Sequence, residues 1–299
     1  MRIPAKIALN PDFNARNKEA VTDLSRLHEH MSKLENPIVV GSLEAENQRG
    51  AGLQSLQSEY LKEAGFALQA AILVKELPAD LHEQLVQACP HTEQFRQLLL
   101  FGNAGPGFWH AAHQYWGNHP IPIEEHPLDQ YASMVARQFM QREVGENVAY
   151  QILYPGAFTV NLQSLGQLLG WHTSSPLMIG IHPEYGLWSA YRVLMLANTD
   201  FASSLAESRH KAQLTDRSRT KSPCESCQTR DCVQACPAQA MNQDGFDIER
   251  CLGYRKQINS RCQNTCVARL ACPVGSEHRY SAEQIHYHYS QSLRLMRQK

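Results

Sequence analysis

Eight of the nine cysteines in this sequence lie between Cys224 and Cys272, and only Cys89 lies outside that interval. Thiolates are good ligands for soft metal ions, and the reducing buffers of the cytosol oppose disulfide formation. The first residues of the chain contain no apolar stretch of signal-peptide length, so we expect a cytoplasmic protein. The cysteine-rich segment is therefore predicted to bind metal, with structural zinc and disulfides as the alternatives.

The spacing of these cysteines favours iron–sulfur clusters over zinc. The first half follows the pattern Cys-x2-Cys-x4-Cys-x3-Cys-Pro, formed by Cys224, Cys227, Cys232 and Cys236. Bacterial ferredoxins use Cys-x2-Cys-x2-Cys-x3-Cys-Pro, in which the fourth cysteine ligates a second [4Fe–4S] cluster. The second half supplies four more thiols and again ends in Cys-Pro; they are Cys251, Cys262, Cys266 and Cys272. A zinc site built from two short knuckles gives no reason for two Cys-Pro endings.

The similarity to ferredoxins implies how eight cysteines divide between two clusters. If the ferredoxin crossover applies, the first cysteine set is Cys224, Cys227, Cys232 and Cys272. The second cysteine set is then Cys236, Cys251, Cys262 and Cys266. Two adjacent clusters imply transport of single electrons from a donor of the ferredoxin or flavodoxin type to something held by the rest of the chain.

Length and composition divide the 299 residues into two predicted domains. Residues 1–206 have the composition of an ordinary globular domain, and 207–299 comprise a linker, the cysteine module and a C-terminal helix. Hydrophobic residues make up 43% of the chain, which is enough for a packed core. The net charge of −1 argues against a nucleic-acid partner, and no apolar run is long enough to span a membrane.

Hydrophobic periodicity predicts a mixture of helices and strands, and hence an α+β chain. Helices are expected at 21–34, 53–64, 79–88, 92–100, 128–142, 160–169 and 282–297. Strands are expected at 37–41, 66–74, 149–154, 177–181 and 187–197. The glycine-rich segment 102–107 and the proline-rich segment 118–127 are expected to be loops.

Between residues 125 and 276 the sequence contains Leu168-Leu-Gly-Trp171, Pro183-Glu-Tyr-Gly186 and Arg192, followed by the cysteine module. This series of motifs resembles the epoxyqueuosine reductase family and the related catalytic domains of reductive dehalogenases. The resemblance implies a nitroreductase-like α/β sandwich that holds cobalamin, followed by a bacterial-ferredoxin-like module whose two [4Fe–4S] clusters feed it electrons. Residues 182–192, together with Ala271-Cys-Pro-Val-Gly275, are also similar to small ferredoxin-like relatives whose role is not established.

The same resemblance implies a set of site residues. Epoxyqueuosine reductases carry an acidic proton donor on the strand before the Gly-Trp helix, and counting back from Trp171 gives Tyr154, a tyrosine in place of that acid, as in reductive dehalogenases; a structural tyrosine is the alternative. The cofactor face would be lined by Gly170, Trp171, His172, Ser174, Ser175, Tyr185, Gly186 and Arg192. A core role for Trp171 and an ordinary ion pair for Arg192 are the alternatives there. A flavin in the same fold is the alternative to cobalamin.

These observations lead to three hypotheses about function. The first is an iron–sulfur oxidoreductase that passes single electrons through two clusters to cobalamin, or to a corrinoid or other small-molecule substrate. The second is a non-enzymatic electron carrier or redox-partner module of the ferredoxin type. The third, epoxyqueuosine reduction in tRNA, is disfavoured by the near-zero net charge, because neutralised phosphates supply most of the affinity for nucleic acids.

Overall fold

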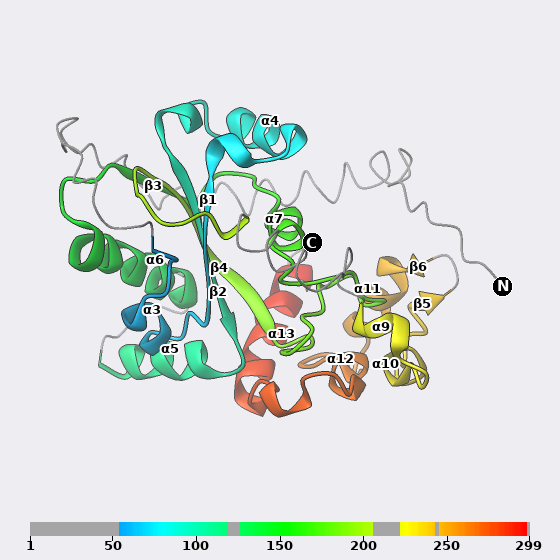
Figure 1. Cartoon of the computed structure of the whole chain (residues 1–299). Helices are drawn as coiled ribbons and strands as arrows, with labels where there is room; N and C mark the ends of the chain where they lie inside the picture. Colours follow the sequence, from blue (N-terminus) through cyan, green and yellow to red (C-terminus); the bar gives the residue numbers. More distant parts are fainter. Residues whose placement is uncertain (1–53, 119–125, 206–221, 243–244, 298–299) are drawn as a thin grey trace.

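A four-stranded antiparallel sheet organises the first part of the chain. The structure, a computed structural model, describes residues 54–118, 126–205, 222–242 and 245–297 (Figure 1). The strands lie in the order β1-β2-β4-β3 and are β1 (Leu68–Leu73), β2 (Gln97–Ala104), β3 (Tyr150–Tyr154) and β4 (Ser189–Ala197). The helix expected at 21–34 and the strand expected at 37–41 lie outside the described residues.

Helices cover both faces of this sheet. One face packs against α3 (Glu59–Glu63), α5 (Gly107–Asn118) and α6 (Pro127–Phe139), and the other against α4 (Ala79–Ala88) and α7 (Leu162–Leu168). Side chains of β2 alternate between the two cores: Leu99 and Phe101 face the first, and Leu98 and Leu100 the second. The expected mixture of helices and strands is therefore confirmed.

The helix predicted at 92–100 is wrong. Residues Thr92–Gln94 form a single 3₁₀ turn, and the chain then enters β2. The run Leu98-Leu-Leu-Phe101 is fully buried because β2 lies between two other strands and has a core on each face. In a continuous apolar run, the spacing of apolar residues shows neither the two-residue period of a strand nor the 3.6-residue period of a helix, so it does not distinguish the two. The expected loop at 102–107 is also partly wrong, since β2 continues to Ala104 and α5 begins at Gly107.

The strand predicted at 177–181 is also wrong. This segment is irregular, and one isolated bridge joins Thr173 to Ile181. The Ser175 hydroxyl donates to the carbonyl of Ile179 (2.6 Å), and Met178 has a φ of 59°, which interrupts an extended conformation. The helix at 79–88 is confirmed to the residue, and elements at 149–154, 187–197 and 282–297 are confirmed with bounds that shift by two residues at most.

Short helices and turns make up the cysteine module, which lies to one side of the sheet in Figure 1. They are α9 (Pro223–Ser226), α10 (Asp231–Gln234), the hairpin β5 (Met241–Asn242) and β6 (Gly245–Phe246), α11 (Ile248–Lys256) and α12 (Val267–Ala271). Single turns lie at Val74–Glu76 and Ser276–His278, with a π turn at Met140–Val144. None of the described helices has both the length and the apolar character needed to cross a membrane.

The last helix, α13 (Ala282–Arg297), joins the two parts of the chain. Its Tyr287 ring packs against Trp109 of α5, with ring centres 5.1 Å apart. On the side of the module, Arg255 of α11 donates to the carbonyl of Tyr289 (3.1 Å). The expected C-terminal helix therefore contacts both the sheet domain and the cysteine module.

Candidate functional site

All nine cysteines are free thiols. Those of the first set come from α9, the turn that follows it, α10 and the C-terminal end of α12. Those of the second set come from the end of α10, from α11 and from the turn before α12. Helices α10 and α12 pack against each other, and this contact brings the two halves of the motif together.

Within the first set, thiols raise the pKa of their neighbours. Burial raises the pKa of Cys224, Cys232 and Cys272, and neighbouring thiols add to each shift. Around Cys232, these neighbours are the other three members of the set. Among the main causes of these three shifts, every contributing thiol belongs to the first set.

The second set forms a separate group around a cavity. Burial raises the pKa of Cys251 to about 11, and the thiols that add to the shift are the other three members of this set. All four thiols line a cavity of about 130 Å³, whose other walls include Leu177, Ile179 and Tyr254. Four thiols around an enclosed apolar space fit the donor set of a [4Fe–4S] cluster. Within the described residues, no three His, Cys, Asp or Glu side chains converge closely enough to hold a single metal ion.

Hydrogen bonds from the module fix the chain around these thiols. Ser222 caps α9 by accepting from the amide of Cys224 (3.2 Å), and its hydroxyl also accepts from Thr173 of the sheet domain (2.9 Å). Arg255 is buried and donates through Nε to the carbonyl of Cys262 (3.1 Å). Both cysteine sets are thus connected to structure outside the ligand loops.

The motifs at 182–186 and 271–275 are in direct backbone contact at two glycines, Gly186 and Gly275. A Cβ added to Gly186 would lie 1.9 Å from the carbonyl oxygen of Val274, and one added to Gly275 would lie 2.4 Å from the carbonyl carbon of Tyr185. His182 holds its turn by accepting at Nδ1 from the amides of Glu184 and Tyr185, both at 3.1 Å. This contact, the glycine seam, joins the sheet domain to the loop after Cys272.

His172 and Tyr191 form a buried pair on the α7 side of the sheet. The Tyr191 hydroxyl and His172 Nδ1 share a hydrogen bond, and the Trp171 ring stacks on Tyr191 with centroids 6.1 Å apart. A Cβ on Gly166 would lie 1.6 Å from the Tyr191 oxygen, so α7 approaches the pair closely. Burial lowers the pKa of His172, and its Nε2 has no hydrogen-bond partner among the described residues.

Tyr154 lies in a second cluster of titratable groups, which we term the acid cluster: Asp129, Tyr154, Arg192, Tyr287 and His288. Burial raises the pKa of Tyr154 to about 12; Asp129 raises it further, and Arg192 lowers it. Burial also raises the pKa of the Asp129 carboxyl, against the opposing effect of Arg192. Both Asp129 and Tyr154 are only partly buried.

Arg192 is positioned by neutral groups. Its Nε donates to Oδ1 of Asn103 (2.7 Å), its guanidinium lies over the Phe108 ring (4.8 Å), and it forms no salt bridge with a described carboxylate. Asn103 in turn donates to the Tyr280 hydroxyl (3.1 Å). Burial, together with the charges of Arg192 and Arg269, lowers the pKa of His288 to about 3, so this imidazole is neutral. The acid cluster thus holds a cation, a protonated phenol and a carboxyl close together.

The residues nominated for a cobalamin face do not form one surface. Tyr154, Trp171 and Tyr191 pack against the core on the α7 side of the sheet, whereas the guanidinium of Arg192 lies over Phe108 of the other core. His172 accompanies Tyr191, and Tyr185 and Gly186 lie at the glycine seam. The Ser175 hydroxyl donates to the carbonyl of Ile179 within its own turn, and the Ser174 hydroxyl accepts from Gln167 (3.5 Å). No atom lies within 4 Å of a Cβ added to Gly170. As a set, these residues do not fit a single corrin ring.

Sequence analysis missed Asp129, Tyr287 and His288. Asp129 stands in the first turn of α6, where an acidic residue is common for reasons of helix stability alone. Tyr287 and His288 lie in a helix whose packing partner the sequence does not reveal. No local signal separates these residues from ordinary ones.

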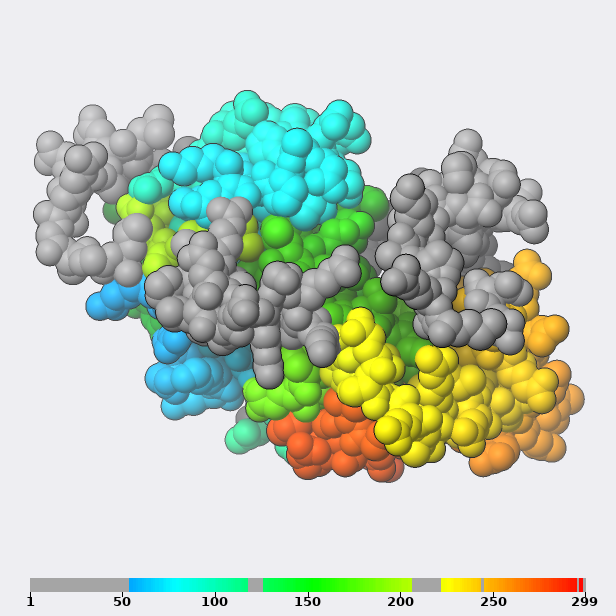
Figure 2. All heavy atoms as spheres, turned by 45° about the vertical axis from the view of Figure 1, so that its right-hand side comes forward, coloured from blue at the N-terminus to red at the C-terminus, as the bar shows by residue number. Residues whose placement is uncertain are grey.

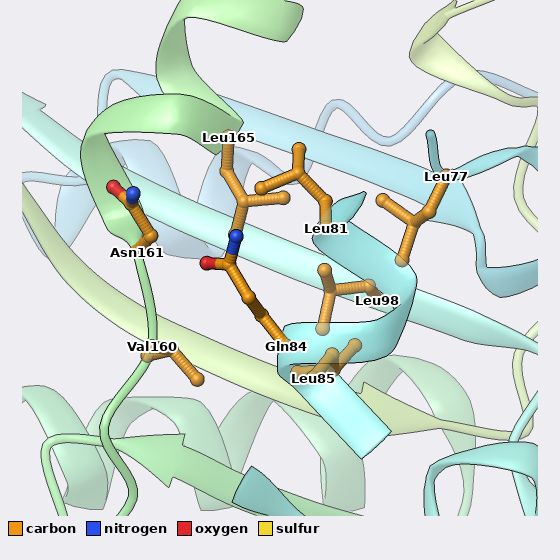
Figure 3. A pocket seen from close by; sticks show the side chains of 8 residues that line it. All are labelled: Leu77, Leu81, Gln84, Leu85, Leu98, Val160, Asn161 and Leu165. Carbon is orange, nitrogen blue, oxygen red and sulfur yellow. The ribbon is translucent and has the colours of Figure 1, made fainter. Parts of the chain in front are cut away.

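A second cavity lies between α4 and α7 (Figure 3). Five leucines and Val160 line it, together with Gln84 and Asn161. Its volume of about 20 Å³ holds roughly one water molecule. It contains no candidate residue and is a packing defect rather than a ligand site.

No protein-family model matches the chain, and no curated protein matches it. Among solved structures, an epoxyqueuosine reductase with a tRNA-Tyr epoxyqueuosine-modified stem loop is 12% identical at a TM-score of 0.46, covering 77% of this chain and 67% of that one. The epoxyqueuosine reductase of Streptococcus thermophilus is 15% identical (TM-score 0.44; 72% and 64% covered). A catabolic reductive dehalogenase in complex with 3-bromo-4-hydroxybenzoic acid is 12% identical (TM-score 0.44; 92% and 40% covered).

These are the two groups that the sequence motifs resemble, so that resemblance is confirmed. The chain spans about two thirds of the length of the epoxyqueuosine reductases and 40% of the dehalogenase. At TM-scores below 0.5, these likenesses support no conclusion about the chemistry of this chain.

Proposed function

We propose that this protein is an iron–sulfur oxidoreductase that passes single electrons through two [4Fe–4S] clusters to an acceptor bound at the acid cluster. The observation that carries the proposal is the cavity lined by Cys236, Cys251, Cys262 and Cys266, together with the ferredoxin-like spacing of all eight cysteines. The first and second cysteine sets would each hold one cluster. When bound, the clusters supply electrons one at a time.

The acid cluster would supply what a reduction needs besides electrons. Tyr154 keeps its proton at neutral pH because burial raises its pKa to about 12, so it is available as a hydrogen-bond donor and a proton donor. Arg192 presents a guanidinium that forms no salt bridge with a described residue, which favours an acceptor that becomes more negative on reduction. Asp129 interacts electrostatically with both Tyr154 and Arg192, and its carboxyl, whose pKa burial raises, would be the source of the proton that Tyr154 would lose.

The acceptor would be cobalamin, a flavin, or a corrinoid or other small-molecule substrate. Because the nominated residues are divided between two faces of β4, we derive no step through a corrin ring or a flavin. The same division favours the second candidate, an electron carrier that hands electrons to a partner protein and binds no cofactor in its sheet domain.

The clusters are tested by anaerobic reconstitution with iron and sulfide. We expect about eight iron atoms per chain and, after dithionite reduction, the low-temperature electron paramagnetic resonance (EPR) signal of interacting clusters. Cys272→Ser and Cys251→Ser should each reduce the iron content by about half, because each removes a ligand of a different set. Cys89→Ser is the matched control, since Cys89 is buried beneath Gln151 and belongs to neither set. Bound zinc without an EPR signal contradicts the proposal.

The acceptor is tested by titrating the reconstituted protein with cob(II)alamin. A change to the five-coordinate, base-off EPR signal supports a corrinoid site in the sheet domain, and Arg192→Met should then weaken binding. An unchanged cobalt signal beside intact cluster signals, with no flavin retained either, favours the electron carrier.

A further inference from the structure

A buried arginine forms part of the wall of the cavity that the second cysteine set surrounds. Arg255 stands one helical turn after Cys251 in α11, so the two side chains share a face of that helix. Arg255 is only 7% exposed, and it lines the cavity together with the four thiols. The same wall contains Thr265, whose buried hydroxyl has no hydrogen-bond partner among the described residues. Two polar side chains thus line a space whose other walls are mostly apolar.

The described hydrogen bonds of the Arg255 guanidinium all go to neutral groups. Nε donates to the carbonyl of Cys262 (3.1 Å), and Nη2 donates to the carbonyl of Tyr289 (3.1 Å). Nη1 donates to the Ser292 hydroxyl (3.2 Å) and to the Met296 sulfur (3.7 Å). Arg255 forms no salt bridge with a described residue. Since burying a cation without an opposite charge is costly, this position calls for an anion nearby.

An iron–sulfur cluster in the adjoining cavity would be that anion. Its four thiolates outweigh the positive charge of the iron–sulfide core, and reduction adds one more negative charge. The charge of Arg255 already reaches this set: burial raises the pKa of Cys251 and of Cys262, and Arg255 opposes the shift at both. The cavity and the guanidinium therefore complement each other in charge.

The first cysteine set has different electrostatic surroundings. Among the main causes of its pKa shifts, the cations are Arg230, at Cys224, and Arg279, at Cys272. Both arginines are exposed. Figure 2 shows the segments of the module, in yellow to orange, at one flank of the molecule, where water and salt screen exposed charges. A buried charge such as that of Arg255 is screened much less.

We propose that Arg255 is the counter-cation of the second cluster and raises its reduction potential. This inference rests on the proposed function, since it needs a cluster in the second cysteine set. Reduction places one electron on the cluster, while no bond forms or breaks and no proton moves. A fixed positive charge beside the cluster stabilises the more negative, reduced state over the oxidised state. The first cluster has no such buried cation among the described residues that act on its thiols, so it should not depend on Arg255.

Another explanation for Arg255 is purely structural. Its bonds to Tyr289 and Ser292 connect α11 to α13, and a connecting residue is needed whatever its charge. Loss of a connection would lower the thermal stability and the iron content, but it would leave the potential of any cluster that still binds unchanged. The reduction potential therefore separates the two explanations.

The test is a redox titration of the reconstituted full chain with dithionite, followed by EPR. Cys251→Ser identifies the midpoint that belongs to the second cluster, because it removes a ligand of that set. Arg255→Gln should make the ratio of reduced to oxidised second cluster about tenfold smaller at a fixed potential, which is a shift of about 59 mV to a more negative midpoint. The midpoint of the first cluster should stay where it is.

Two further variants control for charge and position. Arg255→Lys keeps the positive charge and should leave the second midpoint close to that of the wild type. Arg261→Gln removes an exposed cation next to Cys262 in the sequence, and this matched control should leave both midpoints unchanged because solvent screens it.

An unchanged second midpoint in Arg255→Gln would overturn this inference, as would an equal shift in Arg261→Gln. If Arg255→Gln binds no second cluster, retention of that cluster in Arg255→Lys supports the inference, whereas loss in both variants overturns it in favour of the structural role. In all these cases the wild type holds both clusters, and the proposed function stands. A wild type without a cluster in the second set would overturn the proposed function together with this inference.

Discussion

Replacing Gly186 by alanine tests whether the sheet domain and the cysteine module are in contact at the glycine seam. An added Cβ would lie 1.9 Å from the carbonyl oxygen of Val274, whereas Cβ atoms keep at least 3.0 Å from such neighbours. The two backbones would have to separate by about 1 Å or more. Since neither partner is a flexible side chain, no rotamer change relieves the overlap.

Two costs add at this position. Gly186 has a φ of 55°, and an alanine in that conformation costs about 1–2 kcal/mol. The overlap with Val274 adds about 1–3 kcal/mol, the usual range for overpacking. Gly170 serves to separate the conformational cost from the cost of the overlap, because its φ is 69° and nothing lies within 4 Å of an added Cβ. Gly170→Ala should therefore show the first cost alone.

Thermal unfolding of the reconstituted protein measures the difference. Tm falls by about 2–4 °C for each kcal/mol in domains of 150–250 residues, so Gly186→Ala should melt several degrees below Gly170→Ala. Gly186→Ala should also lose iron from the first cysteine set, because the seam holds the loop after Cys272. Equal melting temperatures and equal iron contents in the two variants would show that the seam is not formed.

Three further predictions concern single side chains. Asp129→Asn should raise Tm at pH 7, because burial raises the pKa of this carboxyl and the folded protein is more stable when the carboxyl is neutral. The gain in Tm should vanish below about pH 4, where the aspartate is protonated in both the folded and the unfolded protein, and a gain independent of pH would be inconsistent with this cause. Tyr191→Phe should cost about 1–3 kcal/mol in urea unfolding, because it leaves the buried Nδ1 of His172 without a partner; an unchanged midpoint would mean that the pair is not formed. Trp109→Ala should cost about 3–5 kcal/mol and speed hydrogen exchange in 282–297, since this ring supports α13; exchange confined to α5 would argue against that contact.

The sequence predicted those parts of the fold whose pattern is local. Helix α4 has one apolar face and polar residues elsewhere, and its bounds are as expected. Strand β2 has two apolar faces, and only its place between β1 and β4 makes it a strand. The segment at 177–181 has the composition of a strand but no neighbouring strand to pair with, apart from the single bridge at Ile181. Tertiary context decided both of these cases.

The candidate site was predictable where chemistry requires a particular spacing. Cys224, Cys227 and Cys232 follow one another at short intervals, which is the pattern that predicted the first set, whereas Cys272 lies 40 residues after Cys232 and was assigned to it only through the ferredoxin crossover. The acid cluster is assembled from α6, β3, β4 and α13, which are up to 159 residues apart between Asp129 and His288. Tyr154 and Arg192 were found through the family motifs, but Asp129 and His288 depend on how helices pack. That information is not local in the sequence.

The position of α13 has a consequence for the order in which the protein is made. This helix is synthesised after everything on which it packs, yet it supplies Tyr287 and His288 to the acid cluster and covers Trp109 of α5. While a ribosome is still extending the cysteine module, the sheet domain exposes an aromatic surface, and its proposed acceptor site is unfinished. Until α13 is made, Arg255 also lacks its hydrogen bond to the carbonyl of Tyr289, so its support for the chain at Cys262 is incomplete. Release of the chain before α13 would therefore leave apolar surface of the sheet domain open to aggregation.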